Sequence, residues 1–515
     1  MLQLKKKVAV IGGGIAGHGC CFTLSMCPEK FEPVLFETRN DYGGNAKSFT
    51  WPDNVITGLS VLAWPPSYFR NYKALLKKLQ CNVASVKLPF MLRNSNGEVY
   101  FANDDGENAS CLRGRKYWEN DIKKWQRMVH FIRKTNIFFH GTDEHSMYHM
   151  SYFNPMNFIT LRSLMRLFFI SNEFWDQIIV PLYASSFLTI ELNTVPAIIV
   201  QVLDDLIPLL DKPRMESWAT HSQDVFDKMT DSSKISNDPK KNIDSANYKK
   251  GAWGFKRYND HKVVEIYRNP ETKKYIIVTA HGKVKEEFDS IVFASNSRNA
   301  ASTIKHQNYT LQSLILNGFQ YTSETDNSFE VGYIHSDPSI FPAAHRKDLL
   351  NEFANYIEVK KENLNQKKAF KYINTFIISS WWPALNDTIV DTTSTTNKKN
   401  RNEMNTFDSF PRLVTYGLSE EESIKKIKNI VGTVENKWNH PHMSFSSLLL
   451  SMSMRFIQGM DDIYYCGSYA TPANGHDLSL CSGICIAMAL GAEYPFPDDT
   501  EAYHDFLRLR RIMGI

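Results

Sequence analysis

The first forty residues combine two short apolar runs with a segment of small residues between them. Val8 to Ile11 is a β-branched run that predicts a strand, and glycines follow it directly. The small residues of Ile15 to Ser25 suit a helix, and Pro33 to Glu37 predicts a second strand. We therefore expect a β-α-β unit in this part of the chain.

The middle of the chain has a different pattern, because aromatic and aliphatic residues recur at helical spacing between Met156 and Leu210. This pattern predicts a helical region. Core packing is its default interpretation, and a tunnel for a lipid is the alternative. Two polar stretches, Thr230 to Lys250 and Asp387 to Asn405, are predicted to be surface insertions.

Strand patterns return in the second half of the chain, where short β-branched and aromatic runs alternate with polar turns. We expect a return to the first sheet, then strands of a second sheet, and finally a strand, a loop and a helix. The segments concerned are Val263 to Ile266, Tyr275 to Thr279, Phe288 to Ala294, Val331 to His335, Phe376 to Trp381 and Ile463 to Leu490.

The composition limits the class of protein. A length of 515 residues suggests two or three domains, and 43% hydrophobic with 22% charged residues is typical of a folded globular protein. A net charge of +4 without a concentrated basic patch argues against a nucleic-acid partner. No apolar window is long enough for a transmembrane helix, so we expect a soluble protein, with peripheral membrane contact as the other possibility. The eight cysteines lack the density and spacing of a disulfide framework, which favours a reducing compartment, and we expect a cytoplasmic location. The cysteines and histidines show no metal-site spacing, and we expect no metal.

A glycine motif follows the first predicted strand. Gly12, Gly14 and Gly17 satisfy G-x-G-x-x-G at the start of the predicted helix, where Ile15 and Ala16 lie. In this motif the first glycine permits a tight turn, the second lets backbone amides approach a pyrophosphate, and the third lets helix and strand pack closely. A glycine-rich turn of another α/β fold is the alternative interpretation.

Glu37 lies twenty positions after Gly17, where the second predicted strand ends. A carboxylate at this position can accept hydrogen bonds from both hydroxyls of an adenosine ribose, which argues against a 2′-phosphate. Together with the glycine motif, Glu37 predicts a dinucleotide site.

The sequence after Glu37 distinguishes between the candidate dinucleotides. Glu37-Thr-Arg39-Asn-Asp-Tyr-Gly43-Gly44-Asn45 resembles the FAD-binding amine oxidase and phytoene desaturase superfamily, in which a Gly-Gly pair follows the glutamate. The resemblance implies FAD as cofactor and implies that Arg39, Gly43, Gly44 and Asn45 continue the site. Asn45 replaces the arginine that is usual there.

The C-terminal part of the sequence extends this resemblance. Gly467 and Ser468, followed by Ser482, Gly483 and an apolar helix, are similar to the element that closes the flavin site in the superfamily. The resemblance implies that Gly467 and Ser468 meet the phosphate and ribityl region, and that the amides near Ser482 and Gly483 face the flavin ring. It also implies that the backbone of Val263 holds the adenine. A dehydrogenase that uses NAD alone needs no such closing element.

The resemblance implies an α/β fold with two domains. A Rossmann-type FAD-binding domain would consist of 1–75, 251–305 and 455–500, and a discontinuous substrate domain of mixed sheet and helices would consist of 76–250 and 306–454. The polar insertions near 230–250 and 387–405 fall in the second domain.

A narrower resemblance covers much of the remaining sequence. Several motifs are similar to those of predicted NAD/FAD-binding proteins that in bacteria often lie near cyclopropane fatty acid synthases. These motifs are Tyr333-Ile-His335-Ser-Asp337-Pro338, Phe341-Pro342, Asn355-Tyr356, Trp438-Asn-His440-Pro441 and His476-Asp477. The sequence departs from the superfamily pattern at Thr57, at Gly251-Ala-Trp-Gly254 and at Ser468, which stands where an acidic residue is common.

The resemblance and the apolar middle region lead to a functional hypothesis. We expect an FAD-dependent oxidoreductase that removes a hydride from an apolar small molecule, a lipid or fatty acyl chain, by desaturation or double-bond isomerisation. A flavin amine oxidase is one alternative, and a flavin-binding protein without turnover is the other. The catalytic residues are not assigned.

Five residues are weighed but left open. His476 is either an acid or base beside the flavin or a brace for its loop, with the brace favoured. His335 and Asp337 are either a catalytic pair or a local side-chain bond. If Trp381 and Trp382 lie on a strand, at most one of them lines the site, since neighbours on a strand point to opposite faces.

Overall fold

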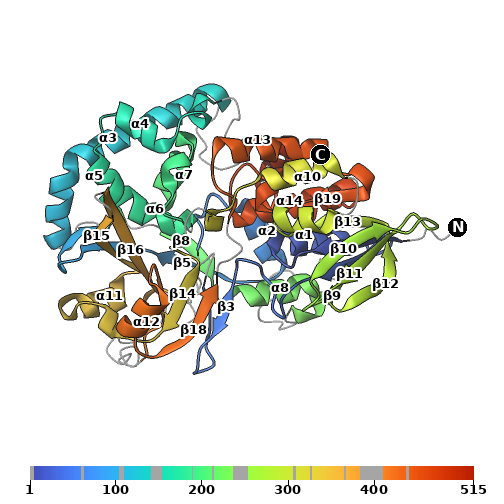
Figure 1. Cartoon of the computed structure of the whole chain (residues 1–515), viewed down its shortest axis with the longest axis horizontal. Helices are drawn as coiled ribbons and strands as arrows, with labels where there is room; N and C mark the ends of the chain where they lie inside the picture. Colours follow the sequence, from blue (N-terminus) through green and yellow to red (C-terminus); the bar gives the residue numbers. More distant parts are fainter. Residues whose placement is uncertain are drawn as a thin grey trace.

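The computed structural model describes residues 5–59, 63–103, 109–140, 154–187, 189–211, 214–235, 253–305, 309–324, 328–364, 367–382, 410–435 and 440–515. Most of the two predicted polar insertions, together with Gly251, Ala252 and Trp438, lies outside these residues. Figure 1 shows two halves side by side, one built around a parallel sheet and the other around a mixed sheet with helices on its outer side.

The parallel sheet has five strands in the order β19-β13-β1-β2-β9. The predicted β-α-β unit is confirmed, since α1 (Ile15–Ser25) connects β1 to β2, and every residue of α1 is buried. The core strands are apolar because helices cover both faces of the sheet. The strands are β1 (Lys6–Ile11), β2 (Phe31–Phe36), β9 (Lys256–Tyr258), β13 (Ser290–Phe293) and β19 (Ile463–Tyr465). They fall within the segments 1–75, 251–305 and 455–500.

A three-stranded antiparallel sheet adjoins the parallel one in the returning segment. It consists of β10 (Val263–Arg268), β11 (Tyr275–Thr279) and β12 (Gly282–Phe288). The strands predicted at the first two of these positions are confirmed. Two further pairs are the local hairpin of β3 (Ser48–Thr50) with β4 (Ile56–Gly58) and the long-range pair of β5 (Val83–Lys87) with β8 (Arg214–Trp218).

The mixed sheet has seven strands in the order β18-β14-β17-β16-β15-β6-β7. They are β6 (Phe90–Asn94), β7 (Val99–Ala102), β14 (Val331–His335), β15 (Asn355–Leu364), β16 (Lys367–Ile377), β17 (Leu413–Tyr416) and β18 (Ile430–Glu435). The predicted strand to Trp381 is too long, because β16 ends at Ile377 and a helical turn, Ile378–Ser380, follows it. Trp381 and Trp382 therefore lie beyond the strand, and both are buried.

Helices cover the outer side of the mixed sheet, as predicted for the middle of the chain (Figure 1). Their buried faces carry residues such as Trp125, Leu164 and Leu203, so core packing explains much of the apolar pattern. These helices are α3 (Ala109–His140), α4 (Leu161–Leu167), α5 (Asn172–Phe174), α6 (Val180–Phe187) and α7 (Val200–Leu206). No described helix is long and apolar enough to cross a membrane.

The remaining helices lie in both halves of the molecule, and two of them, Arg346–Glu352 and Glu420–Lys426, lie beside the mixed sheet (Figure 1). These remaining helices are α2 (Arg70–Lys78), α8 (Ser222–Thr230), α9 (Ser297–Ile304), α10 (Thr310–Gly318), α11 (Arg346–Glu352), α12 (Glu420–Lys426), α13 (Phe445–Ser453), α14 (His476–Leu490) and α15 (Thr500–Met513). Helix α8 lies in the segment expected to belong to the substrate domain, yet it packs on α1, with the Phe226 and His18 rings 4.8 Å apart.

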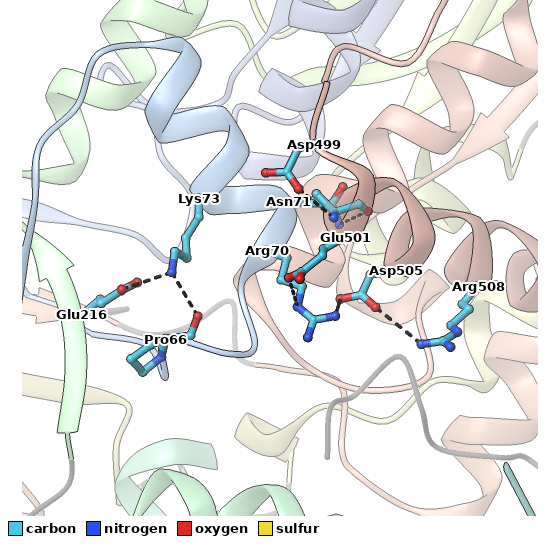
Figure 2. A network of polar contacts seen from close by, with 10 residues as sticks. Pro66, Arg70, Asn71, Lys73, Glu216, Asp499, Glu501, Asp505 and Arg508 are labelled. Carbon is cyan, nitrogen blue, oxygen red and sulfur yellow. Dashed lines mark hydrogen bonds and ion pairs between the residues drawn. The ribbon is translucent and has the colours of Figure 1, made fainter. Parts of the chain in front are cut away.

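Helix α2 packs against both α15 and the start of α14, and Figure 2 shows its contacts with α15. Arg70 lies 3.5 Å from the carboxylate of Asp505, whose side chain is fully buried. In the opposite direction, the backbone amide of Tyr72 donates to Asp477 Oδ1 at 2.5 Å. The N-terminal end of α14 is thus held by residues from a distant part of the chain.

Candidate functional site

A cavity of about 260 Å³ opens at the carboxyl ends of the parallel strands. It begins beside Ile11 at the end of β1, Phe36 at the end of β2 and Ala294 just after β13. The strand order reverses at β1, and ligands of open parallel sheets bind at this kind of position.

Most of the residues predicted to bind the dinucleotide line this cavity. They are Gly12, Gly14, Ile15, Ala16, Glu37, Arg39, Gly43, Gly44, Asn45, Val263, Gly467 and Ser468. Gly17, Ser482 and Gly483 do not line it. The structure therefore brings together residues from three separate segments of the chain.

The three glycines of the first loop have different environments. Gly12 has φ +120°, and a Cβ there would lie 2.7 Å from the backbone of Ala294. A Cβ on Gly17 would lie 2.0 Å from the carbonyl oxygen of Gly12, so Gly17 permits close packing of helix and strand. Gly14 is different, because its Cβ would meet only Gly44 Cα, at 3.8 Å. Gly14 thus leaves open space on the cavity side.

Helix α1 starts inside the cavity at Ile15 and Ala16. Its N-cap residue is Gly14, which provides no side-chain cap. The amides of a first helical turn have no partner within the helix, and the helix dipole adds positive charge there. This end of α1 is suited to bind an anionic group such as a phosphate.

Glu37 is buried and holds the loops around it. Its Oε2 accepts a hydrogen bond from the amide of Gly13 at 2.7 Å, and its Oε1 accepts one from the amide of Arg39 at 3.0 Å. The Arg39 guanidinium donates to the carbonyl oxygen of Gly44 at 3.1 Å. Glu37 and Arg39 therefore connect the first loop to the glycine pair.

The glycine pair lies directly over the first loop. Gly43 and Gly44 have φ of +115° and +61°, a conformation that favours glycine. The amide of Gly43 donates to the carbonyl oxygen of Gly13 at 2.8 Å, and a Cβ on Gly44 would lie 3.0 Å from Gly14 Cα. Side chains at these positions would close the space that the glycines leave.

The C-terminal element closes the other side of the cavity, and the predicted strand, loop and helix are confirmed as β19 and α14. Gly467 has φ +118°, and its amide donates to Ser482 Oγ at 2.8 Å. The first residues of α14 at the cavity are His476 and its N-cap Gly475, with Ser479 one turn later.

The structure does not bring the amides of Ser482 and Gly483 to the cavity as expected. Both residues lie in the second turn of α14, where backbone amides bond within the helix. Gly483 instead faces α1, and a Cβ there would lie 2.0 Å from the carbonyl oxygen of Ala16. The open end of the helix, at Gly475 and His476, takes the place expected for these amides.

The comparisons with known proteins agree with this architecture. Residues 10–79 match a family model described as an NAD(P)-binding Rossmann-like domain. A candidate protoporphyrinogen oxidase from Exiguobacterium sp. 255-15 has a similar structure, with a TM-score of 0.58 and 10% identity over 95% of this chain and 99% of that one. Putrescine oxidase bound to putrescine gives 0.55 and 11%, over 95% and 99%. Reduced UDP-galactopyranose mutase gives 0.54 and 11%, over 98% of each chain.

These similarities cover almost the whole length of both chains in each comparison. The chain has the flavin amine oxidase-like fold. Identities of 10–11% establish a shared fold and not a shared reaction. No curated protein sequence matches the chain.

Among the cavity residues that were not assigned from the sequence, His440 and Tyr321 have polar side chains that can face a ligand. His440 belongs to a motif of the narrower resemblance, but nothing in that motif places its ring in the site. Tyr321, whose hydroxyl donates to Ser297 Oγ at 3.0 Å, has no sequence signal. Both line the cavity, together with Asn299, Ser302 and Thr303 of α9. These residues are far in the sequence from the loops predicted to bind the nucleotide, and only the tertiary fold brings them to the same cavity.

His440 and His476 carry buried nitrogens that have no hydrogen-bond partner in the described part of the chain, Nδ1 of His440 and Nε2 of His476. Burial lowers the pKa of His440 to about 4 and that of His476 to about 3. Both rings are therefore neutral near pH 7. His476 opens α14, and its ring packs edge-on against Tyr72 at 4.6 Å. The loop-bracing hydrogen bond favoured for its side chain is not found among the described residues.

The other residues weighed from the sequence lie away from the cavity in this fold. The amide of Asp337 donates to His335 Nδ1 at 3.2 Å, which is the local bond that the sequence allowed. The Asp337 carboxylate accepts instead from the amides of Ser339 and Lys428. Neither tryptophan at 381–382 lines the cavity. Thr57 is buried and accepts a hydrogen bond from Trp51 Nε1 at 2.9 Å, which is a structural role.

His335 gives a prediction about acid stability. Burial lowers the pKa of His335 to about 4 in the folded protein. Below about pH 6.5 the unfolded chain therefore binds a proton at this histidine that the folded protein does not bind. The stabilising contribution of this group is present above about pH 6.5 and is lost as the pH falls towards 4. Between about pH 7 and pH 5, the unfolding temperature should therefore fall less steeply in His335→Asn than in the wild type. At pH 5 the protonation of this histidine in the unfolded chain lowers the free energy of unfolding of the wild type by about 2 kcal/mol, and the variant should not show this loss.

The control is His504→Asn, because His504 is exposed on α15. Its pH dependence should equal that of the wild type. If His335→Asn and His504→Asn show the same slope of unfolding temperature against pH, His335 is not held neutral by the fold.

Proposed function

We propose that this chain binds FAD in the cavity and is an FAD-dependent oxidoreductase. The observation that supports this most strongly is the uncapped start of α1 inside the cavity, faced by Gly44 across the space that Gly14 leaves open. A dinucleotide phosphate fits such a glycine cradle because backbone amides can approach it closely. The fold shared with flavin enzymes is the second support.

Different residues of the cavity would bind different parts of the cofactor. Gly12, Gly14, Ile15 and Ala16 would bind the pyrophosphate, and Glu37 the adenosine ribose. Arg39, Gly43, Gly44 and Asn45 would extend the phosphate site, and Val263 would hold the adenine. Gly467 and Ser468 would meet the ribityl region. When bound, FAD accepts a hydride from a substrate C–H bond.

His440 and His476 would act next to the cofactor as neutral groups. Each presents a buried ring nitrogen without a hydrogen-bond partner among the described residues, and such a nitrogen is costly unless a ligand satisfies it. Because their pKa values are lowered to about 4 and about 3, they would donate or accept hydrogen bonds without adding positive charge.

The proposed substrate is apolar, a lipid or fatty acyl chain that undergoes desaturation or double-bond isomerisation. A smaller pocket of about 40 Å³ shares Ser468 and Tyr469 with the cavity. Its walls include Ile198 and Ile199 from the apolar middle region, and Phe319 and Leu448 from elsewhere. An apolar chain next to the cofactor would be in contact with these side chains.

Amine oxidation is the second candidate, and it is supported by the fold shared with putrescine oxidase. A cationic amine needs an anionic or aromatic partner. Glu37 is the one carboxylate among the described residues that line the cavity, and both of its oxygens already accept backbone hydrogen bonds. The aromatic residues Tyr321 and Tyr469 also line the cavity. We place lipid substrates first because of the apolar residues in the walls of the smaller pocket. A flavin-binding protein without turnover is the remaining alternative.

We propose a cytoplasmic location. Seven of the eight cysteines have side chains that the structure describes, and all seven are unbridged and buried: Cys20, Cys21, Cys27, Cys81, Cys466, Cys481 and Cys485. Free thiols persist in a reducing compartment, and this supports the proposal.

The first experiment is the visible absorption spectrum of the purified protein, followed by identification of any flavin released on denaturation. Oxidised flavin bands with FAD in the supernatant are expected. Anaerobic bleaching by an unsaturated fatty acid would support the lipid proposal, and bleaching by an amine would favour the amine oxidase. A colourless protein that cannot be reconstituted with FAD would contradict the whole proposal.

A Glu37→Ala variant is expected to bind FAD more weakly by about tenfold to a hundredfold. The substitution removes the carboxylate that would accept hydrogen bonds from the ribose hydroxyls, and a hydrogen bond to a charged group is worth about 1.5–3 kcal/mol. The amides of Gly13 and Arg39 lose their acceptor in the free and the bound protein alike, so this loss lowers stability and not affinity. Titration of the apoprotein with FAD, followed by flavin fluorescence, measures the change. The control is Glu32→Ala, since Glu32 lies on the same strand with an exposed side chain outside the cavity. Equal affinities in the two variants would remove Glu37 from the proposed site.

A further inference from the structure

The outward side of α3 is largely polar around Glu119, Lys123 and Gln126, which are exposed, and changes towards its C-terminal end, where large apolar side chains join the polar ones. Its inward side is apolar, with Trp125, Val129 and Ile132 buried, and this already provides the packing that holds the helix. Its outward side carries Phe131 and Phe138 at a seven-residue spacing, both exposed. A helix of a globular protein normally has charged or polar residues at such positions. The outer aromatic residues are therefore not needed for the core.

Exposed aromatic residues continue from α3 onto the end of α4. The Phe131 ring lies 5.6 Å from the Phe168 ring, and Lys124 Nζ donates to the carbonyl oxygen of Phe169 at 2.6 Å. Phe169 and Phe138 are each 81% exposed, which is far more than a phenylalanine in a packed position. We call this surface the α3–α4 face; it consists of Lys124, Arg127, Phe131, Lys134, Ile137, Phe138, Phe139, Arg166, Leu167 and Phe169.

The backbone of Phe169 makes its exposure more informative. Phe169 has φ +56°, a left-handed conformation that is unfavourable for a bulky residue and natural for glycine. Glycine would also end α4 well at this position, next to the C-cap Phe168. Neither the backbone conformation nor packing in the core therefore accounts for an aromatic side chain at this position.

The charge of the α3–α4 face identifies the kind of partner. Residues 122–140 contain five Lys and Arg and no Asp or Glu. Three of the five are already paired within the protein, Lys123 with Glu119, Lys124 with Asp121, and Arg133 with Asp204 and Asp205. Arg127 and Lys134 are exposed, and neither has an ion-pair partner in the described part of the chain. Arg127, Phe131, Lys134 and Phe138 follow at spacings of four, three and four, so basic and aromatic residues alternate along one side of the helix. Such a mixture matches an anionic lipid surface, where aromatic rings enter the interface and basic groups meet the headgroups.

We propose that the α3–α4 face docks the protein on an anionic membrane surface. Figure 1 shows α3 and α4 at the outer margin of the molecule, on the half away from the parallel sheet, so a membrane can approach them without meeting the cofactor half. The proposal concerns an interaction surface and does not depend on the cofactor or the reaction.

The test is co-sedimentation of the purified full chain with vesicles of phosphatidylcholine alone and with vesicles that also contain phosphatidylserine. Binding is expected to the anionic vesicles and to decrease as salt is added. In Phe138→Ser with Phe169→Gly, the partition coefficient should fall by about tenfold or more. In Arg127→Ala with Lys134→Ala, it should fall by about twentyfold on anionic vesicles only.

The control is Leu314→Ser with Ile424→Ser, which removes two apolar side chains that are 71% and 70% exposed on α10 and α12. It should bind vesicles as the wild type does. Phe169→Gly suits the left-handed backbone, so an unchanged unfolding temperature shows that lost binding is not lost folding. The proposal is overturned if the wild type binds neither vesicle, or if the control loses binding equally. It is also overturned if the phenylalanine variant abolishes self-association and leaves vesicle binding unchanged.

Discussion

Replacing Gly14 by alanine is expected to give a folded protein whose affinity for FAD is lower by at least about tenfold. The new Cβ meets only Gly44 Cα, at 3.8 Å, which is ordinary van der Waals contact. The backbone of Gly14 has φ −78° and ψ −178°, which alanine adopts freely. The methyl group would instead project where the pyrophosphate must approach the first amides of α1. Titration of the apoprotein with FAD and a thermal unfolding curve measure the two effects separately.

Gly254→Ala is the matched control for this variant. A Cβ on Gly254 would also have its nearest neighbour at 3.8 Å, the carbonyl oxygen of Thr230, and Gly254 does not line the cavity. Both variants should unfold near the wild-type temperature, and only Gly14→Ala should lose FAD affinity. Wild-type affinity in Gly14→Ala would show that the start of α1 does not hold the pyrophosphate.

Replacing Gly483 by valine is expected to destabilise the protein by about 3 kcal/mol or more, whether or not FAD is present. Gly483 lies where α14 crosses α1, and its new Cβ would be 2.0 Å from the carbonyl oxygen of Ala16. The neighbouring atom belongs to the backbone of a fully buried helix, so it cannot move aside without moving α1. Urea unfolding of the apoprotein measures the loss, together with the yield of soluble protein.

Gly318→Ala provides the comparison for steric substitutions at helix contacts. A Cβ on Gly318 would meet Leu450 Cδ2 at 2.9 Å, but that atom is the far end of a flexible side chain that can change rotamer. A change of less than about 1 kcal/mol is expected. If Gly483→Val unfolds at the same urea concentration as Gly318→Ala, the two helices can separate without cost and their close contact is not needed for stability.

The N-terminal half of the site could be predicted because its chemistry is local. Gly12, Gly14 and Gly17 have fixed spacings, and each does a separate task in one turn of chain. Glu37 stands at the end of the next strand, so its place beside the first loop follows from the pairing of β1 with β2. The flavin amine oxidase-like fold was accessible from the same residues and from the C-terminal strand and helix.

The other half of the site depends on long-range contacts that a sequence pattern does not specify. Ser482 and Gly483 were placed at the flavin, but the rotation and start of α14 direct them towards Gly467 and Ala16. Tyr321 and His440 reach the cavity only because separate segments pack beside it. The strand expected at Trp381 ends early, because a helical turn and a strand have similar apolar patterns over so few residues.

The contact between α1 and α14 has a consequence for biosynthesis. About 450 residues separate the end of α1 from the start of α14, and a ribosome adds about 5–20 residues per second. The newly made β-α-β unit therefore waits for roughly 20 to 90 seconds with the apolar surface that α14 will cover still open to solvent. During this interval the nascent chain is vulnerable to aggregation and is a natural client for chaperones, and FAD can meet a complete binding site only after β19 and α14 have left the exit tunnel.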